Sequence, residues 1–502
     1  MALINVSHLT FAYDNGQTIF NNVSLQLDTN WKLGLIGRNG RGKTTFLKLL
    51  CGTYPFRGSI HTPVAMQYFP FAMPDPAMTG KEIARAICAG PEDWRLEREA
   101  SLLALAPETL SRPYATLSGG EATKLLLAIL FLNEHSFPLI DEPTNHLDSK
   151  ARATVATYLK AKKGFILVSH DRALLDSCTD HVLSINRTDI ELHRGNFSSW
   201  QDNRQRRDRQ EFAENQRLEK EIARLEQSAR RSTEWSHRAE KGKYTSGHVD
   251  RFLDRGFIGH KAAKMMQRAK SVESRHTKAA QDKAELLHNL EHDAPLAMRP
   301  LTFHSKRLVE CRELCAGYGN TSVLRNISFS VMSGDRLALC GSNGSGKTTL
   351  LSLLTGKGSP GSGVLHLPKG LRVSYVPQNT SFLKGSLKQL SQERGIEESL
   401  LRAVLHRLGF ERRHFETDMG GYSAGQKKKV LLAASLCEEA HLYVWDEPLN
   451  YVDVLSRMQI ENLILHYRPS MILVEHDRMF LERVATGILD LDTACSVALT
   501  LP

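Results

Sequence analysis

The sequence predicts an α/β protein made of two tandem copies of one domain, joined by a long antiparallel α-helical hairpin. Three observations predict this architecture. Segments of the chain recur at a spacing close to the 304 residues between Lys43 and Lys347, short apolar runs in each copy end abruptly in polar residues, and charged helical sequence separates the copies. The expected domains are residues 1–197, 198–298 and 299–502.

The composition is that of a globular protein. At 502 residues, 41% hydrophobic and 24% charged, the chain is long enough for two or three domains with full cores. The N-terminus does not read as a signal peptide, and no run approaches the roughly 18 apolar residues of a membrane span. We therefore expect a cytoplasmic protein with no membrane partner, whose scattered cysteines stay reduced. The net charge of +10 indicates a polyanionic partner or serves solubility alone.

Three motifs recur in register and define the repeat. They are GRNGRGKTT at 37–45 and GSNGSGKTT at 341–349, FPLIDEPTNHLD at 137–148 and LYVWDEPLNYVD at 442–453, and FILVSHD at 165–171 and MILVEHD at 471–477. The chain is therefore a tandem duplication. The apolar runs have the length and continuity of buried parallel strands, and ligands of such sheets collect at the carboxyl ends of the strands.

Both copies contain the pattern GxxxxGK[ST] between an apolar strand and a helix-compatible run, the context that a phosphate-binding P-loop requires. The glycines let backbone N–H groups surround phosphates, while the lysine reaches the β/γ oxygens and the next threonine holds Mg²⁺. ATP and Mg²⁺ are the expected cofactors. The expected nucleotide-binding residues of the two loops are Gly37, Asn39, Gly40, Gly42, Lys43, Thr44, Thr45, Gly341, Asn343, Gly344, Gly346, Lys347, Thr348 and Thr349.

Each copy places an acidic pair after an apolar strand, in the sequence DEP. Asp141 and Asp446, at the strand ends, are suited to hold Mg²⁺ through water. The adjacent Glu142 and Glu447 can polarise the attacking water. A solvated turn is the alternative interpretation, and the recurrence of the pair in both copies argues against it.

LSGGE at 117–121 and YSAGQ at 422–426 each precede a helical run, so that small residues leave N–H groups at a helix N-terminus free to meet a phosphate. These segments resemble the signature motif of ATP-binding-cassette proteins, and the likeness covers nearly the whole chain. The family's fold implies a head-to-tail sandwich of two cassettes with two ATP molecules at the interface. The signature residues that this implies are Ser423 and Gly425 facing the nucleotide of Lys43, and Ser118, Gly119 and Gly120 facing the nucleotide of Lys347.

The same resemblance implies roles for four further side chains. Tyr13 and Tyr318, each a little over twenty residues ahead of a P-loop, match the aromatic residue that stacks on adenine in the family. His170 and His476 match its switch histidine. Taken alone, a tyrosine or histidine is more often structural, so these roles depend on the family frame.

The two copies depart from the family pattern in different places. VSYVPQ in the second copy ends in the family's coupling glutamine, Gln378, which implies a contact to metal and water, whereas the aligned MQYFPF of the first copy ends in Phe71. Ala424 replaces a glycine of the second signature, and Glu121 replaces a glutamine of the first. We expect the first ATP site, built with Phe71 and Ala424, to be the slower one.

The segment from about 198 to 295 is charged and helical in pattern, and it predicts two long antiparallel helices with a bend in the stretch 240–261. Ten Lys/Arg and three Asp/Glu between residues 241 and 280 place most of the excess positive charge there. A solvated basic linker is one interpretation, and a probe that contacts RNA phosphates and stacks rings on bases is the other. The candidate contact residues at and near the tip, around 235–259, are Trp235, Lys241, Lys243, Tyr244, Phe252, Phe257, Lys261, Lys264 and Arg268.

Paired cassettes without membrane spans, the sequence DEPTNHLD and the charged two-helix linker together resemble the ABC-F proteins, and EWS, GFIGHKAAKMM and WDEPLNYVDV resemble their Lsa-type antibiotic-resistance subgroup. This resemblance implies an ATPase that binds the exit site of the bacterial 70S ribosome, with 23S rRNA and P-site tRNA as partners and no DNA. It also implies a monomer whose cassettes pair within one chain. The linker tip would dislodge lincosamides, streptogramin A compounds and pleuromutilins, and hydrolysis would drive release.

Two other functions stay open. A housekeeping translation factor of the same architecture would relieve stalled ribosomes without protecting them from drugs. A soluble ATPase subunit of a drug exporter would need a membrane partner, and nothing in the sequence resembles a coupling surface for one.

Overall fold

The computed structural model describes residues 2–13, 18–73, 75–88, 92–145, 147–186, 190–207, 297–318, 321–342, 344–410, 412–493 and 495–498, with single helical positions between 209 and 227. By compactness the chain divides into two units, one of Met1–Trp200 with Pro295–Pro502 and one of Gln201–Ala294. The expected boundaries near 197 and 298 remain a prediction, because this division joins both cassettes in one unit. In the second unit the described positions are helical, and the predicted tip lies outside the described residues.

The first cassette contains a six-stranded sheet in the order β5-β6-β7-β3-β8-β9 and a three-stranded antiparallel sheet in the order β2-β1-β4. All neighbours in the larger sheet are parallel except β8 and β9. The elements are β1 Leu3–Ala12, β2 Thr18–Asp28, β3 Lys32–Gly37, α1 Lys43–Leu50, β4 Arg57–His61, β5 Ala65–Phe69, α2 Gly80–Ile87, α3 Asp93–Leu102, the 3₁₀ turns η1 Pro107–Ser111 and η2 Tyr114–Thr116, α4 Gly119–Leu130, β6 Ser136–Asp141, α5 Ser149–Ala161, β7 Phe165–Val168, α6 Arg172–Cys178, β8 His181–Ile185 and β9 Ile190–Arg194.

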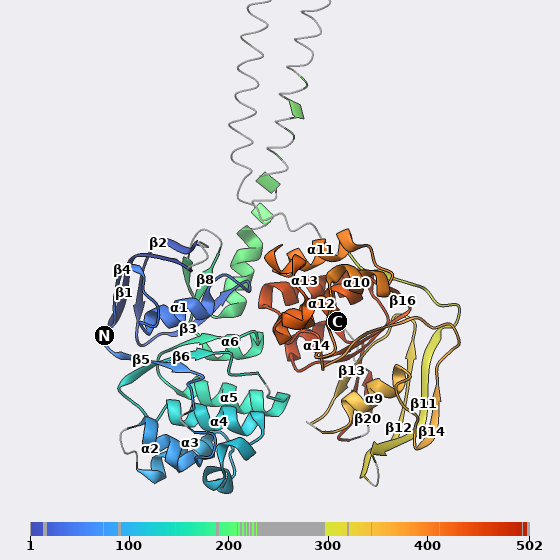
Figure 1. The fold of residues 1–502 in the computed structure, drawn as a ribbon, viewed down its shortest axis with the longest axis horizontal. Coiled ribbons are helices and arrows are strands. Elements are labelled where there is room, and N and C mark those ends of the chain that lie inside the picture. Colours follow the sequence, from blue (N-terminus) through green and yellow to red (C-terminus); the bar gives the residue numbers. More distant parts are fainter. Residues whose placement is uncertain are drawn as a thin grey trace, which may run out of the picture. The chain divides into compact units, whose positions relative to one another are not determined.

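The second cassette repeats this topology, with a six-stranded sheet β15-β17-β18-β13-β19-β20 and a three-stranded sheet β12-β11-β14. Figure 1 shows both sets of elements. They are β10 Arg299–Pro300, β11 Arg307–Tyr318, β12 Thr321–Met332, β13 Arg336–Cys340, α9 Lys347–Leu354, β14 Ser362–His366, β15 Val373–Val376, α10 Leu387–Glu393, α11 Glu398–Arg407, η4 Arg412–Glu416, η5 Met419–Gly421, α12 Ala424–Cys437, β16 Glu439–Ala440, β17 Leu442–Asp446, α13 Val454–Tyr467, β18 Met471–Val474, α14 Arg478–Val484, β19 Gly487–Asp490 and β20 Cys495–Ala498.

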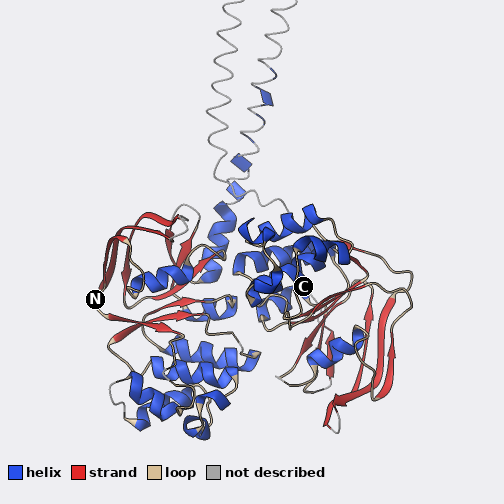
Figure 2. Ribbon diagram, in the orientation of Figure 1, coloured by secondary structure: helices blue, strands red, loops and turns tan. Residues whose placement is uncertain are grey.

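The parallel strands are apolar throughout because both of their faces are covered. In β3, Leu33 and Leu35 belong to a core cluster shared with α1 and the small antiparallel sheet. Ile36 points to the other face, into a cluster shared with α2, α4 and α5. A strand buried on both sides needs apolar residues at every position, which explains the runs seen in the sequence. Figure 2 shows these helices and strands, which confirm the predicted α/β fold with two tandem cassettes.

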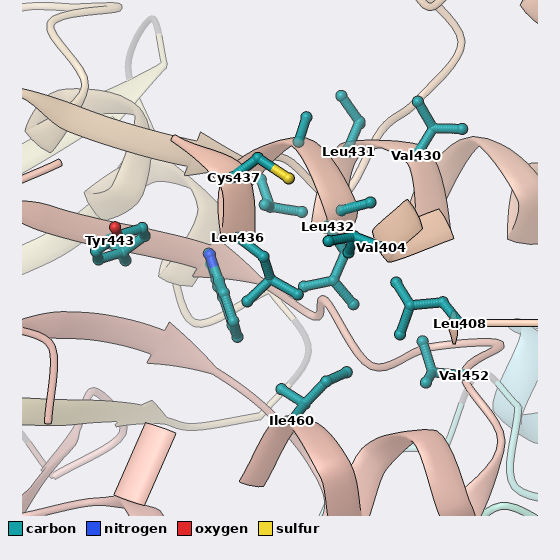
Figure 3. Close-up of a cluster of buried hydrophobic side chains, with 14 of the residues drawn as sticks. Val404, Leu408, Val430, Leu431, Leu432, Leu436, Cys437, Tyr443, Val452 and Ile460 are labelled. Atoms are coloured by element: carbon teal, nitrogen blue, oxygen red, sulfur yellow. The ribbon is translucent and has the colours of Figure 1, made fainter. Parts of the chain in front are cut away.

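Helix α12 is the centre of the core of the second cassette (Figure 3). From Lys428 to Cys437 every residue is buried, so this part of the helix has no solvent-facing side, as expected of a helix inside a large core. Leu432 and Leu436 lie in the same cluster as Val404 and Ile460 from the neighbouring helices.

Two further predictions concern the chain as a whole. Every cysteine of the part that the structure describes up to Cys437 is a free thiol, in agreement with reduced cysteines. Across the described ranges, no helix has both the length and the apolar composition required to cross a bilayer.

Candidate active site

Each P-loop runs from the end of a buried strand to the start of a helix, α1 in the first cassette and α9 in the second. Gly42 precedes α1 with φ of 89°, and a Cβ there would lie 2.4 Å from Ile19 Cγ2. Gly346 precedes α9 with φ of 94°, and a Cβ there would lie 2.6 Å from Leu324. Both positions therefore require glycine, for the left-handed backbone and for the space.

The P-loop lysines lie inside the loops that precede them. Lys43 Nζ donates to the carbonyl oxygen of Gly37 at 2.7 Å, and Lys347 Nζ donates to that of Gly341 at 2.8 Å. Burial lowers the pKa of Lys43, against the charges of Asp453, Glu142 and Asp141. The cationic amines thus lie at the centre of loops shaped for anions, as the sequence predicts.

The carboxyl ends of β6, β7 and β3 are neighbours in the sheet, so they bring the acidic pair, the switch histidine and the P-loop together. Thr44 Oγ1 lies 2.7 Å from Asp141 Oδ2, and Thr348 Oγ1 lies 3.0 Å from Asp446 Oδ2. A hydroxyl and a carboxylate oxygen at one point are ligands that suit Mg²⁺, which commonly takes one or two protein groups together with substrate phosphates. In the described residues no group of three or more His, Cys, Asp and Glu could hold a metal ion by itself.

Glu142 and Glu447 follow these aspartates in an unusual backbone conformation. Their φ values are 52° and 48°, in the left-handed region that non-glycine residues rarely adopt. The turn is held by a hydrogen bond from each glutamate N–H to the last carbonyl of the neighbouring strand, Val168 O at 2.9 Å and Val474 O at 3.0 Å. Its presence at both candidate catalytic carboxylates, and the cost of such a conformation, favour a functional reason for it.

The predicted switch histidines contact these carboxylates. His170 Nε2 lies 3.2 Å from Glu142 Oε1, and His476 Nε2 lies 3.5 Å from Glu447 Oε1. Burial, together with the charges of Lys43 and two other cations, holds the pKa of His170 well below its ordinary value. His170 is therefore neutral near pH 7.

Residues from both cassettes line one cavity of about 920 Å³. Its wall combines the first signature with one P-loop residue, the glutamate of the acidic pair, the coupling glutamine and the predicted switch histidine of the second copy. These lining residues are Ser118, Gly119 and Gly120 from the first cassette, and Gly344, Gln378, Glu447 and His476 from the second. In the head-to-tail sandwich that the family resemblance implies, Ser118, Gly119 and Gly120 are expected to face the nucleotide of Lys347.

On the side of the first P-loop, residues of the two cassettes contact each other directly. Asn39 of the first P-loop donates from its backbone N–H to Asp453 Oδ2 at 3.3 Å and from Nδ2 to the carbonyl oxygen of Tyr451 at 2.8 Å. A Cβ on Gly425 would lie 2.9 Å from Tyr451 Cβ. Tyr451 therefore links the second signature to the first P-loop, on the side where Ser423 and Gly425 were expected to face Lys43.

The two P-loop regions also match a known family. The ABC transporter family model matches residues 20–145 and 324–450, which together make up just over half of the chain.

The chain belongs to the ABC transporter family.

Relatives of this ABC protein extend over nearly its whole length. The probable ATP-binding protein YheS of Escherichia coli strain K12 is 28% identical over 516 residues, covering 93% of this chain and 75% of its own. The ribosome protection protein VmlR of Bacillus subtilis strain 168 is 27% identical over 510 residues, covering 97% of this chain and 86% of its own. A crystal structure of archaeal ribosomal stalk protein aP1 with the archaeal ribosome recycling factor aABCE1 matches with a TM-score of 0.63, 19% identity, and coverage of 96% and 87%. That structural likeness concerns the fold alone.

The two ABC sites differ in the direction in which the pKa of the glutamate is shifted. Burial and the charge of Asp141 raise the pKa of Glu142 to about 8, against Lys43 and Arg457. The pKa of Glu447 is lowered: burial opposes its ionisation, but the hydrogen bond and charge of His476 and a hydrogen bond from Gln378 outweigh that effect. The second glutamate is therefore better prepared to accept a proton at neutral pH.

Phe71 gives part of the reason for this difference. It packs at the edge of the helical core of the first ABC cassette, whereas Gln378 lines the cavity beside Glu447. Glu142 Oε1 is buried without a hydrogen bond of good geometry. The loss of the polar contact at Phe71, expected from the sequence, agrees with these positions.

Both signature helices start with a capping box. Ser118 accepts from the N–H of Glu121 at 3.3 Å, and Glu121 accepts in return from the Ser118 N–H at 2.9 Å. Ser423 and Gln426 make the same pair in the second ABC cassette, at 3.2 and 2.9 Å. Glu121, which stands where the family has a glutamine, therefore keeps the cap, because either side chain supplies the required oxygen.

Other predicted site residues are placed in part or not at all. The Tyr13 hydroxyl lies 2.7 Å from Thr45 Oγ1, and its ring packs edge-to-face on Phe11, so it lies beside the P-loop. Tyr318 ends β11, but its side chain is not described. Outside the described residues lie Asn343 and the linker residues Trp235, Lys241, Lys243, Tyr244, Phe252, Phe257, Lys261, Lys264 and Arg268.

Sequence reasoning missed two side chains that touch the acidic pairs. Tyr68 donates its hydroxyl hydrogen to Asp141 Oδ2 at 3.0 Å. Lys428 Nζ donates to the carbonyl oxygens of Asp446 at 2.6 Å and Pro377 at 2.8 Å. Tyr68 could have been found, because the repeat places Tyr375 at the same position in the second copy; Lys428 has no basic counterpart in the first signature helix.

Proposed function

We propose that the chain is an ATPase of the ABC-F type, whose two composite sites hydrolyse ATP to ADP and phosphate with Mg²⁺. The observation that carries this proposal is the cavity that gathers Gly344, Glu447 and His476 of the second cassette with the signature of the first. The second cassette supplies the other groups that phosphoryl transfer to water needs: the backbone N–H donors of the P-loop, Lys347, and the metal-binding pair of Thr348 and Asp446.

In the second site, Glu447 is the residue that receives the proton of the attacking water. The water oxygen bonds to the γ-phosphorus while the bond from phosphorus to the β–γ bridging oxygen breaks. His476 holds the Glu447 carboxylate in place, at 3.5 Å between Nε2 and Oε1. Thr348 and Asp446 would hold Mg²⁺, which when bound offsets the charge of the β- and γ-phosphates.

The first site uses Glu142, His170, Thr44 and Asp141 in the same roles, but it is proposed to be slower. The pKa of its carboxyl group is raised to about 8, which favours the protonated form. A protonated carboxyl group cannot accept the proton of water. Phe71 supplies no polar contact that would correct this.

Ribosome protection is the proposed biological role. ATP would close the cassettes into a form that binds the exit site of the bacterial 70S ribosome, against 23S rRNA and P-site tRNA. The linker tip would then reach the peptidyl-transferase centre and dislodge lincosamides, streptogramin A compounds or pleuromutilins, and hydrolysis would release the protein. The support is the resemblance to Lsa-type ABC-F proteins, the similarity to VmlR and the basic linker. The protein would act in the cytoplasm as a monomer.

The ATPase proposal is tested by the double variant Glu142→Gln/Glu447→Gln. Its phosphate release should fall by about 100-fold or more, because both water-orienting carboxylates are gone while the phosphate ligands remain. Glu134→Gln is the matched control, because this glutamate is 71% exposed and should keep the wild-type rate. A double variant that hydrolyses ATP at the wild-type rate would contradict the assignment.

The role on the ribosome is tested by cell-free translation titrated with lincomycin, tiamulin and chloramphenicol, with and without the protein. The wild type should raise the inhibitory concentration of lincomycin and tiamulin, and Lys43→Met/Lys347→Met, which cannot engage the phosphates, should not. A protein that binds ribosomes and hydrolyses ATP without any shift in drug inhibition would favour the housekeeping translation factor.

A further inference from the structure

Five charged side chains form a cluster between the two cassettes. This interface cluster consists of Arg172 from the first cassette and Arg457, Glu461, Asp477 and Arg483 from the second. Arg172 Nη2 lies 2.9 Å from Glu461 Oε2 and 3.7 Å from Asp477 Oδ2, and all three side chains are at most 1% exposed. Arg457 Nη1 lies 3.3 Å from Asp477 Oδ2, and Arg483 Nη1 lies 2.5 Å from Glu461 Oε1.

Burying the charges of this cluster is energetically unfavourable. Moving charges out of water is unfavourable, and their mutual attraction in a buried site often does no more than offset that cost. Nε and Nη2 of Arg172 and both Glu461 oxygens lack a hydrogen bond of good geometry, so charge attraction alone holds them. A buried ion pair of this kind is better explained by a need for one defined arrangement of the cassettes than by stability.

The interface cluster has no counterpart at the repeat-related positions of the two cassettes. The repeat aligns Arg172 with Arg478 and Glu461 with Ala156. Arg478 is 83% exposed and pairs with Glu482 on its own helix at 2.7 Å. Alanine has no charge to offer, so the opposite half of the interface lacks the equivalent pair.

Apolar contacts between the cassettes are asymmetric in the same way: side chains of the second cassette pack into the core of the first. Val454, at the start of α13, is buried in the helical core of the first cassette, and Leu455 and Met458 pack against that core. In the described ranges, no residue of α5, the equivalent helix of the first cassette, belongs to the corresponding core of the second. The start of α13 in the second cassette therefore packs into the core of the first cassette, and α5 makes no equivalent contact with the core of the second.

The cluster also connects the two ATP sites. Arg172 begins α6 two residues after His170, and Asp477 directly follows His476. Arg457 is fixed by hydrogen bonds to the carbonyl oxygens of Val452 and Leu449, both at 2.9 Å. The residues that follow the two predicted switch histidines therefore meet where the Arg172 guanidinium group approaches Asp477.

We infer that Arg172 is a positioning residue, whose ion pairs with Glu461 and Asp477 keep the second cassette docked on the first along one side of the interface between rounds of ATP binding. This role rests on the proposed ATPase function. When the cassettes are already docked, ATP binding does not have to supply the free energy of assembling their interface. Loss of the ion pairs should therefore weaken the apparent binding of ATP more than it slows the chemical step.

The test is the double variant Arg172→Met/Glu461→Met, which removes both buried charges and leaves no orphan, since Arg483 is 48% exposed and Asp477 keeps Arg457. The KM for ATP should rise about 10-fold, the order of a contact between coupled residues, while kcat stays within about twofold. Arg172→Lys, which keeps the charge, should recover part of this shift. Arg478→Met, at the aligned exposed position, is the matched control and should behave as wild type.

Calorimetry without nucleotide gives a second readout that needs no hydrolysis. The wild-type cassettes should unfold in one transition, and those of the double variant in two, because docking couples their unfolding. If the wild type does not hydrolyse ATP, the proposed function fails and calorimetry alone decides the docking role. An unchanged KM in an active protein, a shift of the same size in Arg478→Met, or a single transition in the double variant would overturn the inference.

Discussion

Glu142 and Glu447 have the same side chain, the same neighbours in sequence and the same left-handed backbone, yet opposite pKa shifts. The difference comes from what surrounds them. Gln378 and His476 stabilise the ionised form of Glu447, while Glu142 is buried beside Asp141 with Phe71 in place of the glutamine. The chemistry of a repeated motif therefore depends on contacts outside the motif.

This difference predicts unequal pH profiles. A carboxyl group accepts a proton only when it is ionised, which requires a pH above its pKa, so a raised pKa moves the loss of activity to higher pH. On acidification, Glu447→Gln, which retains only the first carboxylate, should lose hydrolysis at a higher pH than Glu142→Gln. Single-turnover rates measured over about pH 5 to 9 would check this, and superimposable profiles would contradict it.

At the scale of elements, α12 illustrates how a signature helix is held. Ser423 caps its start, and its remaining turns are buried on all sides among α11, α13 and the sheet. A helix that is buried on all sides over most of its length cannot move without disturbing its core, so the signature serine is positioned by the packing of the turns that follow it.

Leu432→Ala should therefore lower the free energy of unfolding of the docked cassettes, which are expected to unfold together, by about 2–5 kcal/mol, because Leu432 is fully buried and its truncation leaves a cavity. Leu102→Ala, at a 54% exposed position of α3, should change it by less than about 0.5 kcal/mol. Urea unfolding followed by circular dichroism would measure both. Equal midpoints for the two variants would mean that this core is not packed as described.

The linker tip gives a second prediction at this scale. Tyr244→Ala, Phe252→Ala and Phe257→Ala should reduce drug protection in cell-free translation while ATPase activity stays near wild type, because planar rings offer stacking area on RNA bases at small entropic cost. Deletion of residues 245–250 tests reach without choosing a ring. A deletion that still protects fully would show that this stretch is only a linker.

At the scale of the whole molecule, the proposed cycle predicts a trapped state. Glu142→Gln/Glu447→Gln should bind ATP without hydrolysing it, remain on ribosomes and inhibit translation, because release is proposed to require hydrolysis. Sucrose gradients with ATP would detect the bound form. Recovery of this variant only in the ribosome-free fractions would argue against the cycle.

Salt dependence of that trapped complex tests the basic linker. Binding through many Lys/Arg contacts to phosphate should weaken steeply with salt, because each contact releases counterions. Neutralising Lys261, Lys264, Arg268 and Lys270 together should flatten the slope of affinity against salt concentration. An unaltered slope would mean that these charges form a solvated surface.

The two cassettes, their P-loops and the acidic pairs can be predicted without a structure, because each is encoded in a short segment whose residue types and strand or helix context are visible locally. Comparison of the two copies also identifies Phe71 as the residue that stands in the first copy where Gln378 stands in the second. The repeat marks Tyr68 as a candidate, but its contact with Asp141, like the pairing of Arg172 with Glu461, is seen in the tertiary structure alone. Those contacts join segments far apart in the chain, and an exposed and a buried arginine look alike in sequence. Which charge is buried, and against what, is decided by how complete elements pack.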